Sequence, residues 1–384
     1  MARNTASTGL RTHNPRSRVG DKVLPGDVRQ RHRALLMQCL FKGEPLSRAD
    51  LARATGLTRV SVSDVVTELL ELDLIEEIGT RPGTRVGKPA TLVTVKYDGR
   101  SIVCLDLSDE SEFRGAVINL EGEVLYRKAV KLAGQTGQAA VEIVFALAKE
   151  LIKGTNTPIL GIGVGTPGVV NAQGLVRKAP NLGWQDLDLP QLLTQELQYP
   201  AYVANDADTA VLAESTFGQG NGAGLILVQI SHGVGAGILC DGILLRGPDG
   251  TAGEIGHVRI SDDNVLCACG RTGCLEAFIA TPHLRSRIAG KSEAQATQEL
   301  TNAGQQLGQV LAPIVQALGI LDITLFGPAE LLDGALCESA QTTINAATSH
   351  FGDQDVAIRM SALGDDGVLI GAAAHVLGLE LGLS

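Results

Sequence analysis

Residues 250–276 read GTAGEIGHVRISDDNVLCACGRTGCLE. Four potential metal ligands lie in this stretch: His257, Cys267, Cys269 and Cys274. One imidazole and three thiolates suit a tetrahedral zinc ion, and the spacing H-x9-C-x-C-x4-C lets one loop surround it. Because this set leaves no open coordination position, we expect a structural zinc rather than one that activates water. The alternative is three buried cysteines beside a core histidine, but Gly270 and Gly273 supply backbone freedom that a packed core does not need.

Two carboxylates flank this loop, Glu254 three residues before His257 and Glu276 two residues after Cys274. Both would be fixed relative to the same ion, which is one way to build a polar pocket. With its glycines, carboxylate, histidine and cysteines in register, the sequence resembles the signature of the ROK family, which comprises bacterial sugar kinases and sugar-responsive transcriptional repressors. The resemblance extends over most of the chain from about residue 101. The preceding residues therefore decide whether the chain resembles the kinases or the repressors of this family.

Composition indicates a globular protein of two or three domains, with 384 residues, 44% hydrophobic and 19% charged. No stretch has the length and apolar content of a membrane span or a signal core, so we expect a cytoplasmic protein without a membrane partner. Residues 1–96 carry 16 Lys and Arg against 10 Asp and Glu, whereas the rest carries 16 against 32. This asymmetry favours nucleic acid binding by the N-terminal part, with a solvated basic tail as the alternative.

A DNA-binding domain is predicted over residues 27–97, after a flexible polar arm over residues 1–26. Apolar spacing predicts a helix over 28–41. Ser47 and Asp50 begin a second helix with a capping box, Gly56 makes a turn, and Thr58 caps a third helix over 60–75. Two short helices joined at a glycine turn indicate a helix-turn-helix.

A wing follows, because the strand-like segments LIEEIG and ATLVTV enclose the basic turn TRPGTRVGKP at 80–89. The side chains expected to contact DNA bases or phosphates are Thr58, Arg59, Ser61, Ser63, Arg81, Arg85 and Lys88.

Strands alternate with helices from residue 98 to the C-terminus. A three-stranded meander, a helix and a buried strand with a glycine-rich exit make a first half, and a second meander begins near residue 223. This order is similar to the actin-like ATPase fold of sugar kinases, in which two α/β lobes face each other. The predicted fold is α/β: an N-terminal winged helix-turn-helix, then a two-lobed ROK sugar kinase-type domain over 98–384 with a zinc loop at 257–274.

The resemblance also implies a sugar site. The residues that match it are Asn181, Asn205, Asp206, Glu254, His257 and Glu276. In ROK kinases the aspartate that matches Asp206 is the base that takes a proton from a sugar hydroxyl. The alternatives are that Asp206 is a helix N-cap and that Asn181 is a turn residue.

The turn that grips nucleotide phosphates departs from the kinase pattern. Sugar kinases of this fold begin with Asp-x-Gly-Gly-Thr, but this chain has DLSDE at 106–110. Both glycines are absent, and Asp109 and Glu110 would repel a phosphate. The second glycine turn at 231–235 is kept, whereas LFGPAELL replaces the glycine pair usual at the adenosine site. We therefore expect no catalytic residue and no enzyme activity.

The sequence thus predicts a sugar-responsive DNA-binding regulator, a repressor of carbohydrate or amino-sugar uptake or catabolism genes. A sugar or sugar phosphate would close the lobes of a homodimer or homotetramer and release operator DNA. N-acetylated hexosamines or their 6-phosphates are favoured as effectors, with glucose or xylose as alternatives. The alternative function is an ATP-dependent sugar kinase with an accessory DNA-binding domain.

Overall fold

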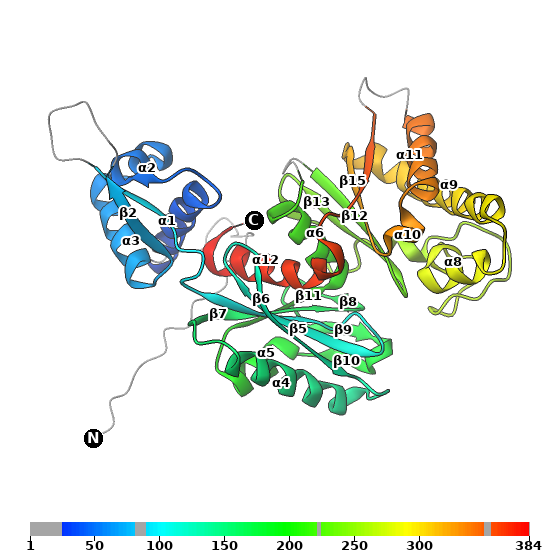
Figure 1. The fold of residues 1–384 in the computed structure, drawn as a ribbon, viewed down its shortest axis with the longest axis horizontal. Coiled ribbons are helices and arrows are strands. Elements are labelled where there is room, and N and C mark those ends of the chain that lie inside the picture. Colours follow the sequence, from blue (N-terminus) through cyan, green and yellow to red (C-terminus); the bar gives the residue numbers. More distant parts are fainter. Residues whose placement is uncertain (1–24, 81–89, 221–223, 349–354, 384) are drawn as a thin grey trace.

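The computed structural model describes residues 25–80, 90–220, 224–348 and 355–383. Most of the expected N-terminal arm and the expected wing tip, with Arg81, Arg85 and Lys88, lie outside these ranges. A small N-terminal unit is followed by two α/β lobes (Figure 1). Within the described residues, no helix has the length and apolar content needed to cross a membrane.

The N-terminal unit has the topology of a winged helix-turn-helix. Its elements are α1 (Pro25–Leu40), β1 (Leu46–Ser47), α2 (Arg48–Thr55), α3 (Arg59–Glu71), β2 (Ile75–Thr80) and β3 (Thr91–Val95), with the sheet order β1-β3-β2. Ser47 forms the expected capping box with Asp50, Gly56 has φ +71°, and Thr58 caps α3. The expectation that α3 continues to residue 75 was wrong, because Asp73 adopts a left-handed φ of +58° and β2 begins at Ile75.

Each lobe contains a five-stranded sheet with the same connectivity. The strands of the first are β4 (Ser101–Asp106), β5 (Glu112–Asn119), β6 (Val124–Lys131), β7 (Ile159–Thr166) and β11 (Ala201–Asn205), in the order β11-β7-β4-β5-β6. The strands of the second are β12 (Gly224–Ile230), β13 (Val234–Cys240), β14 (Ile243–Leu244), β15 (Asp322–Phe326) and β16 (Ala357–Met360), in the order β14-β13-β12-β15-β16. In both sheets an antiparallel meander is extended by two parallel strands. This repeat is the expected two-lobed, actin-like architecture.

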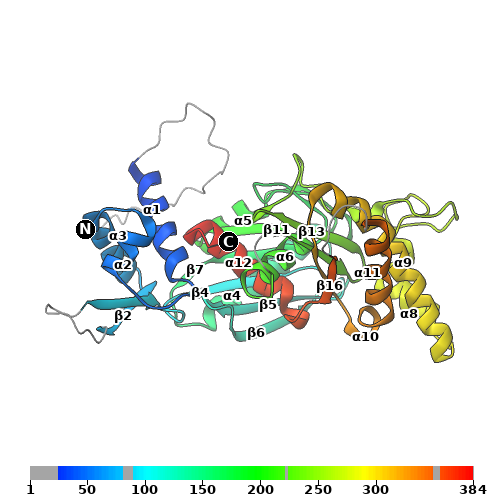
Figure 2. The same ribbon diagram turned by 90° about the horizontal axis from the view of Figure 1, so that it is seen from above.

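Helices cover the outer faces of the two sheets (Figures 1 and 2). The first lobe has α4 (Gly137–Lys153), α5 (Leu189–Leu197), the 3-10 helix η1 (Pro180–Leu182) and a small sheet of β8 (Val169–Val170), β9 (Val176–Ala179) and β10 (Trp184–Leu187). The second has η2 (Ile255–His257), α7 (Glu276–Ile279), α8 (Thr281–Ile288), α9 (Glu293–Leu318), α10 (Ala329–Leu332) and α11 (Ala335–Thr348). Between the sheets lie α6 (Asp206–Thr216), η3 (Gly364–Asp366) and α12 (Gly367–Leu381).

Helices α6 and α12 pack backbone against backbone. A Cβ atom built on Gly371 would lie 1.8 Å from the carbonyl oxygen of Thr209, so only glycine fits there. Gly163 of β7 is equally confined, since its Cβ would lie 2.3 Å from the carbonyl oxygen of Ala372. Apart from His375 and Glu380, helix α12 consists of apolar residues and glycine, as expected for a helix that is enclosed on nearly all sides. It therefore lies directly between α6 and the first sheet.

The N-terminal unit shares a hydrophobic core with the first lobe. Buried side chains of α1 and α3, such as Leu36 and Leu69, belong to one cluster with Ile118 of β5 and Leu377 of α12. The unit is thus packed onto the body rather than connected by the chain alone.

The α6–α12 contact yields a stability prediction. Gly371→Ala forces two helices apart, so we expect the free energy of unfolding to fall by about 2 kcal/mol. This corresponds to a midpoint lower by about 5 °C in thermal unfolding. Ala146→Ser, at an exposed position of α4, is the matched control and should change stability by no more than about 0.5 kcal/mol. Equal midpoints for both variants would contradict the close packing.

Candidate functional site

The four predicted metal ligands lie together in the structure. Their ligand atoms all lie within 4.8 Å of one another. The Cys267 Sγ atom is 3.6 Å from His257 Nδ1, and the Sγ atoms of Cys269 and Cys274 are 3.8 Å apart. A tetrahedral zinc with Zn–S bonds of about 2.3 Å places its thiolates about 3.8 Å apart, so the donor set and its spacing fit a metal ion.

The loop that presents these ligands is shaped by short backbone contacts. The isolated bridge of Leu266 with Thr272 and the hydrogen bond from the Cys267 amide to the Arg271 carbonyl fold the segment back on itself. Gly273 has φ +75°, and a Cβ there would lie 2.0 Å from the Ser261 carbonyl oxygen. This position requires glycine for both reasons.

Protonation of the thiols depends on their surroundings. Hydrogen bonds from the backbone and side chain of Arg271 lower the pKa of Cys269 to about 6, which favours the thiolate that a metal needs. Burial raises the pKa of Cys267, because a buried thiolate lacks solvation. A bound cation would offset that cost.

Both flanking carboxylates contact the metal cluster. Glu254 Oε2 lies 3.7 Å from His257 Nε2, the ring nitrogen opposite the one that faces the cysteines. Glu276 accepts a hydrogen bond from Cys267 Sγ at 3.3 Å and another from the backbone N–H of Val234 at 3.1 Å. Glu276 therefore joins the metal loop to the glycine turn at 231–235. Burial raises the pKa of Glu254, as does nearby Glu276, against the opposing effect of His257.

Asn205 and Asp206 lie where β11 ends and α6 begins. Asn205, not Asp206, is the N-cap: its side-chain oxygen accepts from the backbone N–H groups of Ala207 and Asp208. Its amide donates to the Gly168 carbonyl at 2.9 Å and has a second N–H for a ligand. Asp206 Oδ2 accepts from Gln229 Nε2 at 2.9 Å. Burial and the nearby Asp106 raise the pKa of Asp206 to about 7.

Asn181 is placed differently. It lies in η1, and its side-chain amide donates to Glu110 Oε1 at 2.7 Å. The structure thus brings Glu254, His257 and Glu276 together and Asn205 beside Asp206, whereas Asn181 is bound to the altered phosphate turn.

In the altered phosphate turn at 106–110, the side chains of the turn itself form hydrogen bonds and an ion pair. Asp106 is 1% exposed and forms an ion pair of 2.5 Å with Arg114, which also donates to the Asp365 carbonyl at 2.9 Å. Asp106 accepts from the Ser108 amide, and Asp109 accepts from the amides of Ser111 and Glu112. Within this turn the Ser108 amide is therefore paired already, and the Asp109 carboxylate is bound to the amides of the two residues that follow the turn.

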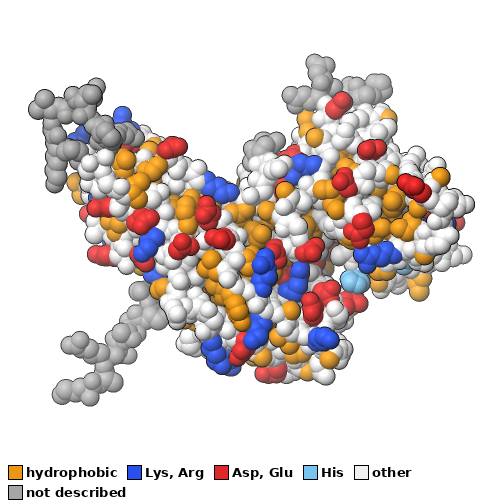
Figure 3. All heavy atoms as spheres, viewed as in Figure 1, with side chains coloured by type: hydrophobic (Ala, Val, Ile, Leu, Met, Phe, Trp, Pro, Cys, Tyr) orange, Lys and Arg blue, Asp and Glu red, His pale blue; other side chains and the backbone are white. Residues whose placement is uncertain are grey.

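The pKa of Asp109 reflects this pairing. Burial acts to raise it, but hydrogen bonds from Ser111 and Glu112 and the proximity of His232 outweigh burial, and the pKa of Asp109 is lowered. Basic and acidic side chains lie next to each other on the surface near the middle of the molecule (Figure 3).

Sequence reasoning missed several polar residues behind the site. Gln229 holds Asp206, and its only sequence signal is one amide in an apolar strand. Arg246 lies 3.5 Å from buried Asp208 and 3.2 Å from His375 Nε2. Burial raises the pKa of Asp208 to about 6, although Arg246 opposes this shift. No short motif marks this cluster.

The candidate DNA face is the N-terminal end of α3. The Thr58 hydroxyl accepts from the Ser61 amide at 3.1 Å and contacts the Ser61 hydroxyl, so both residues contribute to the cap. Arg59 and Ser63 are exposed. Val60, which the sequence reasoning omitted, is 71% exposed, and an apolar side chain there suits a thymine methyl group.

The molecule thus consists of a unit with winged helix-turn-helix topology packed onto a two-lobed, actin-like body that carries a His/Cys3 loop. The pattern described as "ROK family" matches residues 103–378. The chain belongs to the ROK family.

Its relatives include repressors and a kinase. The xylose repressor of Caldicellulosiruptor bescii is 32% identical over 68% of this chain and 66% of its own length. The N-acetylglucosamine repressor of Escherichia coli is 24% identical over 83% and 85%. The glucokinase of Halalkalibacterium halodurans is 36% identical, but only over 48% of this chain and 58% of its own.

Among solved structures, a ROK family transcriptional regulator described as a homologue of E. coli Mlc superposes with a TM-score of 0.79 at 24% identity. It covers 93% of this chain and 98% of its own. The whole fold, including the N-terminal unit, is therefore that of a ROK regulator.

The raised pKa of Asp206 gives a prediction with a definite sign. A carboxyl whose folded pKa is about 7 favours the folded state fully below its unfolded pKa, near 3.9, and loses that contribution as the pH rises through 7. Asparagine does not titrate. The free energy of unfolding of Asp206→Asn, relative to the original protein, should therefore be greater at pH 8 than at pH 5 by roughly 2 kcal/mol.

Glu150→Gln is the control, because hydrogen bonds from Lys128 and Lys153 lower the pKa of Glu150, and neither the carboxylate nor these lysines titrate between pH 5 and pH 8. Its stability difference should be equal at the two pH values. If the stability difference between Asp206→Asn and the original protein, measured by denaturant unfolding, were the same at pH 5 and pH 8, the pKa of the Asp206 carboxyl would not be raised.

Proposed function

We propose that this protein is a sugar-responsive transcriptional repressor. It binds operator DNA through the winged helix-turn-helix and leaves it when a sugar closes the two lobes. The observation that carries this proposal is the altered phosphate turn at 106–110. The Ser108 amide is paired with Asp106, Asp106 is paired with Arg114, and Asp109 and Glu110 add two carboxylates where a kinase of this fold binds phosphate.

The sugar site consists of the residues that the family resemblance indicated. Asp206, Glu254, Glu276 and His257 offer acceptors and one ring nitrogen, and the amides of Asn181 and Asn205 offer donors. Such groups suit sugar hydroxyls, because each unpaired buried hydroxyl weakens binding. Xylose is the first effector to test, since the relative that this chain matches at 32% identity is a xylose repressor. N-acetylglucosamine is the second, from the other repressor.

Zinc is the proposed metal of the His257, Cys267, Cys269 and Cys274 set. Three thiolates and an imidazole leave no open position, so the ion would stabilise the loop and hold Glu254 and Glu276 in place. The side chains of this chain perform the sugar recognition.

Operator contacts are proposed for the exposed end of α3 and for the wing. Arg59, Val60 and Ser63 would enter the major groove, after the cap formed by Thr58 and Ser61 has set the start of the helix. Arg81, Arg85 and Lys88 are proposed to reach phosphates or the minor groove. Because such proteins read paired half-sites, we propose that a homodimer or homotetramer binds the operator.

A kinase is the alternative, and the stretch shared with a glucokinase supports it. The contacts made by the turn at 106–110 are evidence against a kinase. A nucleotide phosphate would have to displace Asp109 from the Ser111 and Glu112 amides and would then lie beside Asp109 and Glu110.

Ligand binding tests the function directly. Xylose at about 100 times its dissociation constant should stabilise the protein by about 2.7 kcal/mol, seen as a raised unfolding midpoint, whereas MgATP should leave the midpoint unchanged. Xylose should also weaken binding to an operator fragment about tenfold in fluorescence anisotropy. Glu254→Gln should lose both responses, and Glu142→Gln, on the exposed face of α4, should keep them. ADP formation with any sugar of a hexose and pentose panel would establish the kinase instead.

Metal analysis tests the zinc proposal. We expect one zinc per chain, less than half of that in Cys269→Ser, and a lower unfolding midpoint for this variant. Cys39→Ser, which changes a free thiol of α1 far from the loop, should keep its zinc. Full zinc content in Cys269→Ser would remove Cys269 from the ligand set.

A further inference from the structure

Helix α6 reaches from the candidate sugar site to the DNA-binding unit. Asn205 and Asp206 are at its N-terminal end, and Thr216 and Phe217 are at its C-terminal end. Eleven residues span about 16 Å, and a helix of this length does not bend without a proline or a defect. A shift at Asp206 is therefore carried to Thr216.

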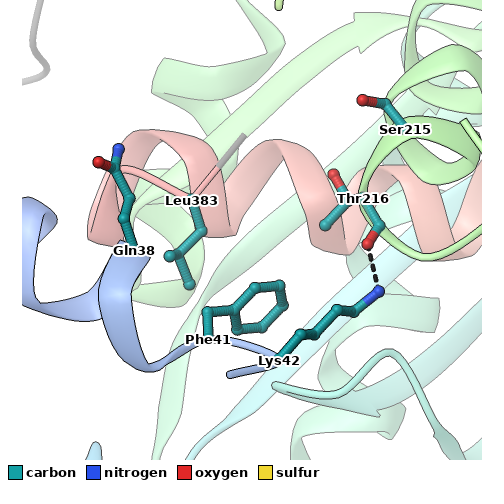
Figure 4. A pocket seen from close by; sticks show the side chains of 6 residues that line it. All are labelled: Gln38, Phe41, Lys42, Ser215, Thr216 and Leu383. Atoms are coloured by element: carbon teal, nitrogen blue, oxygen red, sulfur yellow. Dashed lines mark hydrogen bonds between the residues drawn. The ribbon is translucent and has the colours of Figure 1, made fainter. Parts of the chain in front are cut away.

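Lys42 of the DNA-binding unit holds the far end of this helix. Its ammonium donates to the carbonyl oxygen of Thr216, the last residue of α6 (Figure 4). It lies 5.0 Å from the centre of the Phe217 ring and 5.8 Å from that of Phe41. A cation at a helix C-terminus and over an aromatic face is favourable on both counts.

The backbone of Lys42 is also unusual. It has φ +54°, in the left-handed region, two residues after the last residue of α1, where glycine is the usual residue. Its amide donates to the Tyr97 hydroxyl at 3.0 Å. The Phe41 ring packs edge-on against Phe217, with centroids 6.3 Å apart. A lysine thus stands at a position where a glycine would adopt the backbone conformation more easily, which points to a role for its side chain.

The same unit is held separately by the first lobe. Arg100 donates to the Leu72 carbonyl at 2.9 Å, and Gln38 donates to the Gly382 carbonyl beyond α12 at 2.7 Å. In contrast, the C-terminal half of α6 is joined to the second lobe, because buried Glu214 pairs with Arg359 and Ser361. The DNA-binding unit therefore contacts both the first lobe and the helix that is joined to the second lobe.

The junction leaves room for a movement of α6. A cavity of about 290 Å³ lies between α1, the end of α6 and the C-terminus, lined by Gln38, Phe41, Lys42, Ser215, Thr216 and Leu383 (Figure 4). Space at this point allows the end of α6 to shift against α1 without a clash.

We propose that Lys42 is the positioning residue through which α6 transmits sugar binding to the DNA-binding unit. Closure on the sugar moves α6 with the second lobe, and the Lys42 contacts with Thr216 and Phe217 pull the α1–β1 connection with it. The reading helix α3 then leaves its register with the operator. This inference rests on the proposed sugar-responsive function.

The test is Lys42→Met, which keeps a long apolar side chain and removes the ammonium. Lys153→Met, at an exposed lysine of the last turn of α4, is the matched control. Three quantities are measured with xylose as the probe and a DNA fragment selected by the original protein from a random pool. They are xylose affinity, operator affinity without xylose, and the factor by which xylose weakens operator binding.

In Lys42→Met, the xylose affinity and the operator affinity without xylose should both stay within about threefold of the original values. The coupling factor, by which xylose weakens operator binding, should fall from about tenfold to less than about twofold. Hydrogen exchange of residues 25–71 should respond to xylose in the original protein and in Lys153→Met but not in Lys42→Met. Phe217→Leu, which removes the ring under the ammonium, should reduce the coupling factor in the same direction and serves if Lys42→Met does not fold.

An unchanged coupling factor in Lys42→Met or in Phe217→Leu would overturn the inference. Loss of operator binding without xylose in both variants would also overturn it, because the contact would then only hold the domain in place. Failure of the proposed function is distinct, since the original protein itself would then show no effect of xylose on operator binding.

Discussion

The packing of α6 against α12 is the contact on which the pocket, the two lobes and the DNA-binding unit all depend. The absence of a side chain at Gly371 lets α12 touch the backbone of α6 at Thr209, and Gly163 lets the first sheet approach α12 just as closely. The end of the chain therefore lies between the lobes and beside α1. Because α6 also carries Asp206 at its start, the geometry of the proposed sugar site and that of the DNA-binding unit are set by the same pair of helices.

A second constraint comes from the metal loop. The segment at 258–273 contains no long helix or strand, so its own backbone does little to fix Glu254 and Glu276. Four ligands of one ion would fix both carboxylates, Glu254 through His257 and Glu276 through Cys267. Glu276 extends this link to the Val234 amide and thus to the glycine turn of the second lobe.

The features that the sequence predicted are those whose causes are local. The caps at Ser47 and Thr58 depend on partners three residues away, and the metal ligands lie within 18 residues. The order of the strands followed from periodicity and from the family resemblance. In contrast, Asn181 pairs with Glu110 across 71 positions, and Gln38 reaches Gly382 across 344. Such contacts are set by tertiary packing, which no spacing in the sequence records. The end of α3 was missed for a different reason, because the left-handed Asp73 interrupts a segment whose apolar pattern continues.

The paired phosphate turn has a consequence for how the lobes close. In a turn that binds a nucleotide, backbone amides await a phosphate and are satisfied by water until it arrives. Here Asp109 satisfies the amides of Ser111 and Glu112, and Arg114 balances the charge of buried Asp106. These pairs hold the turn together without a ligand, so in the proposed repressor neither an open nor a closed arrangement of the lobes would need a nucleotide. In the proposed repressor the sugar alone then shifts the equilibrium between them, and the extent of the shift is set by its difference in affinity for the two states. If this fold also bound ATP, the equilibrium between the two arrangements would depend on the ATP concentration as well as on the sugar. A repressor that is to respond to the sugar alone therefore requires a turn that does not bind nucleotide.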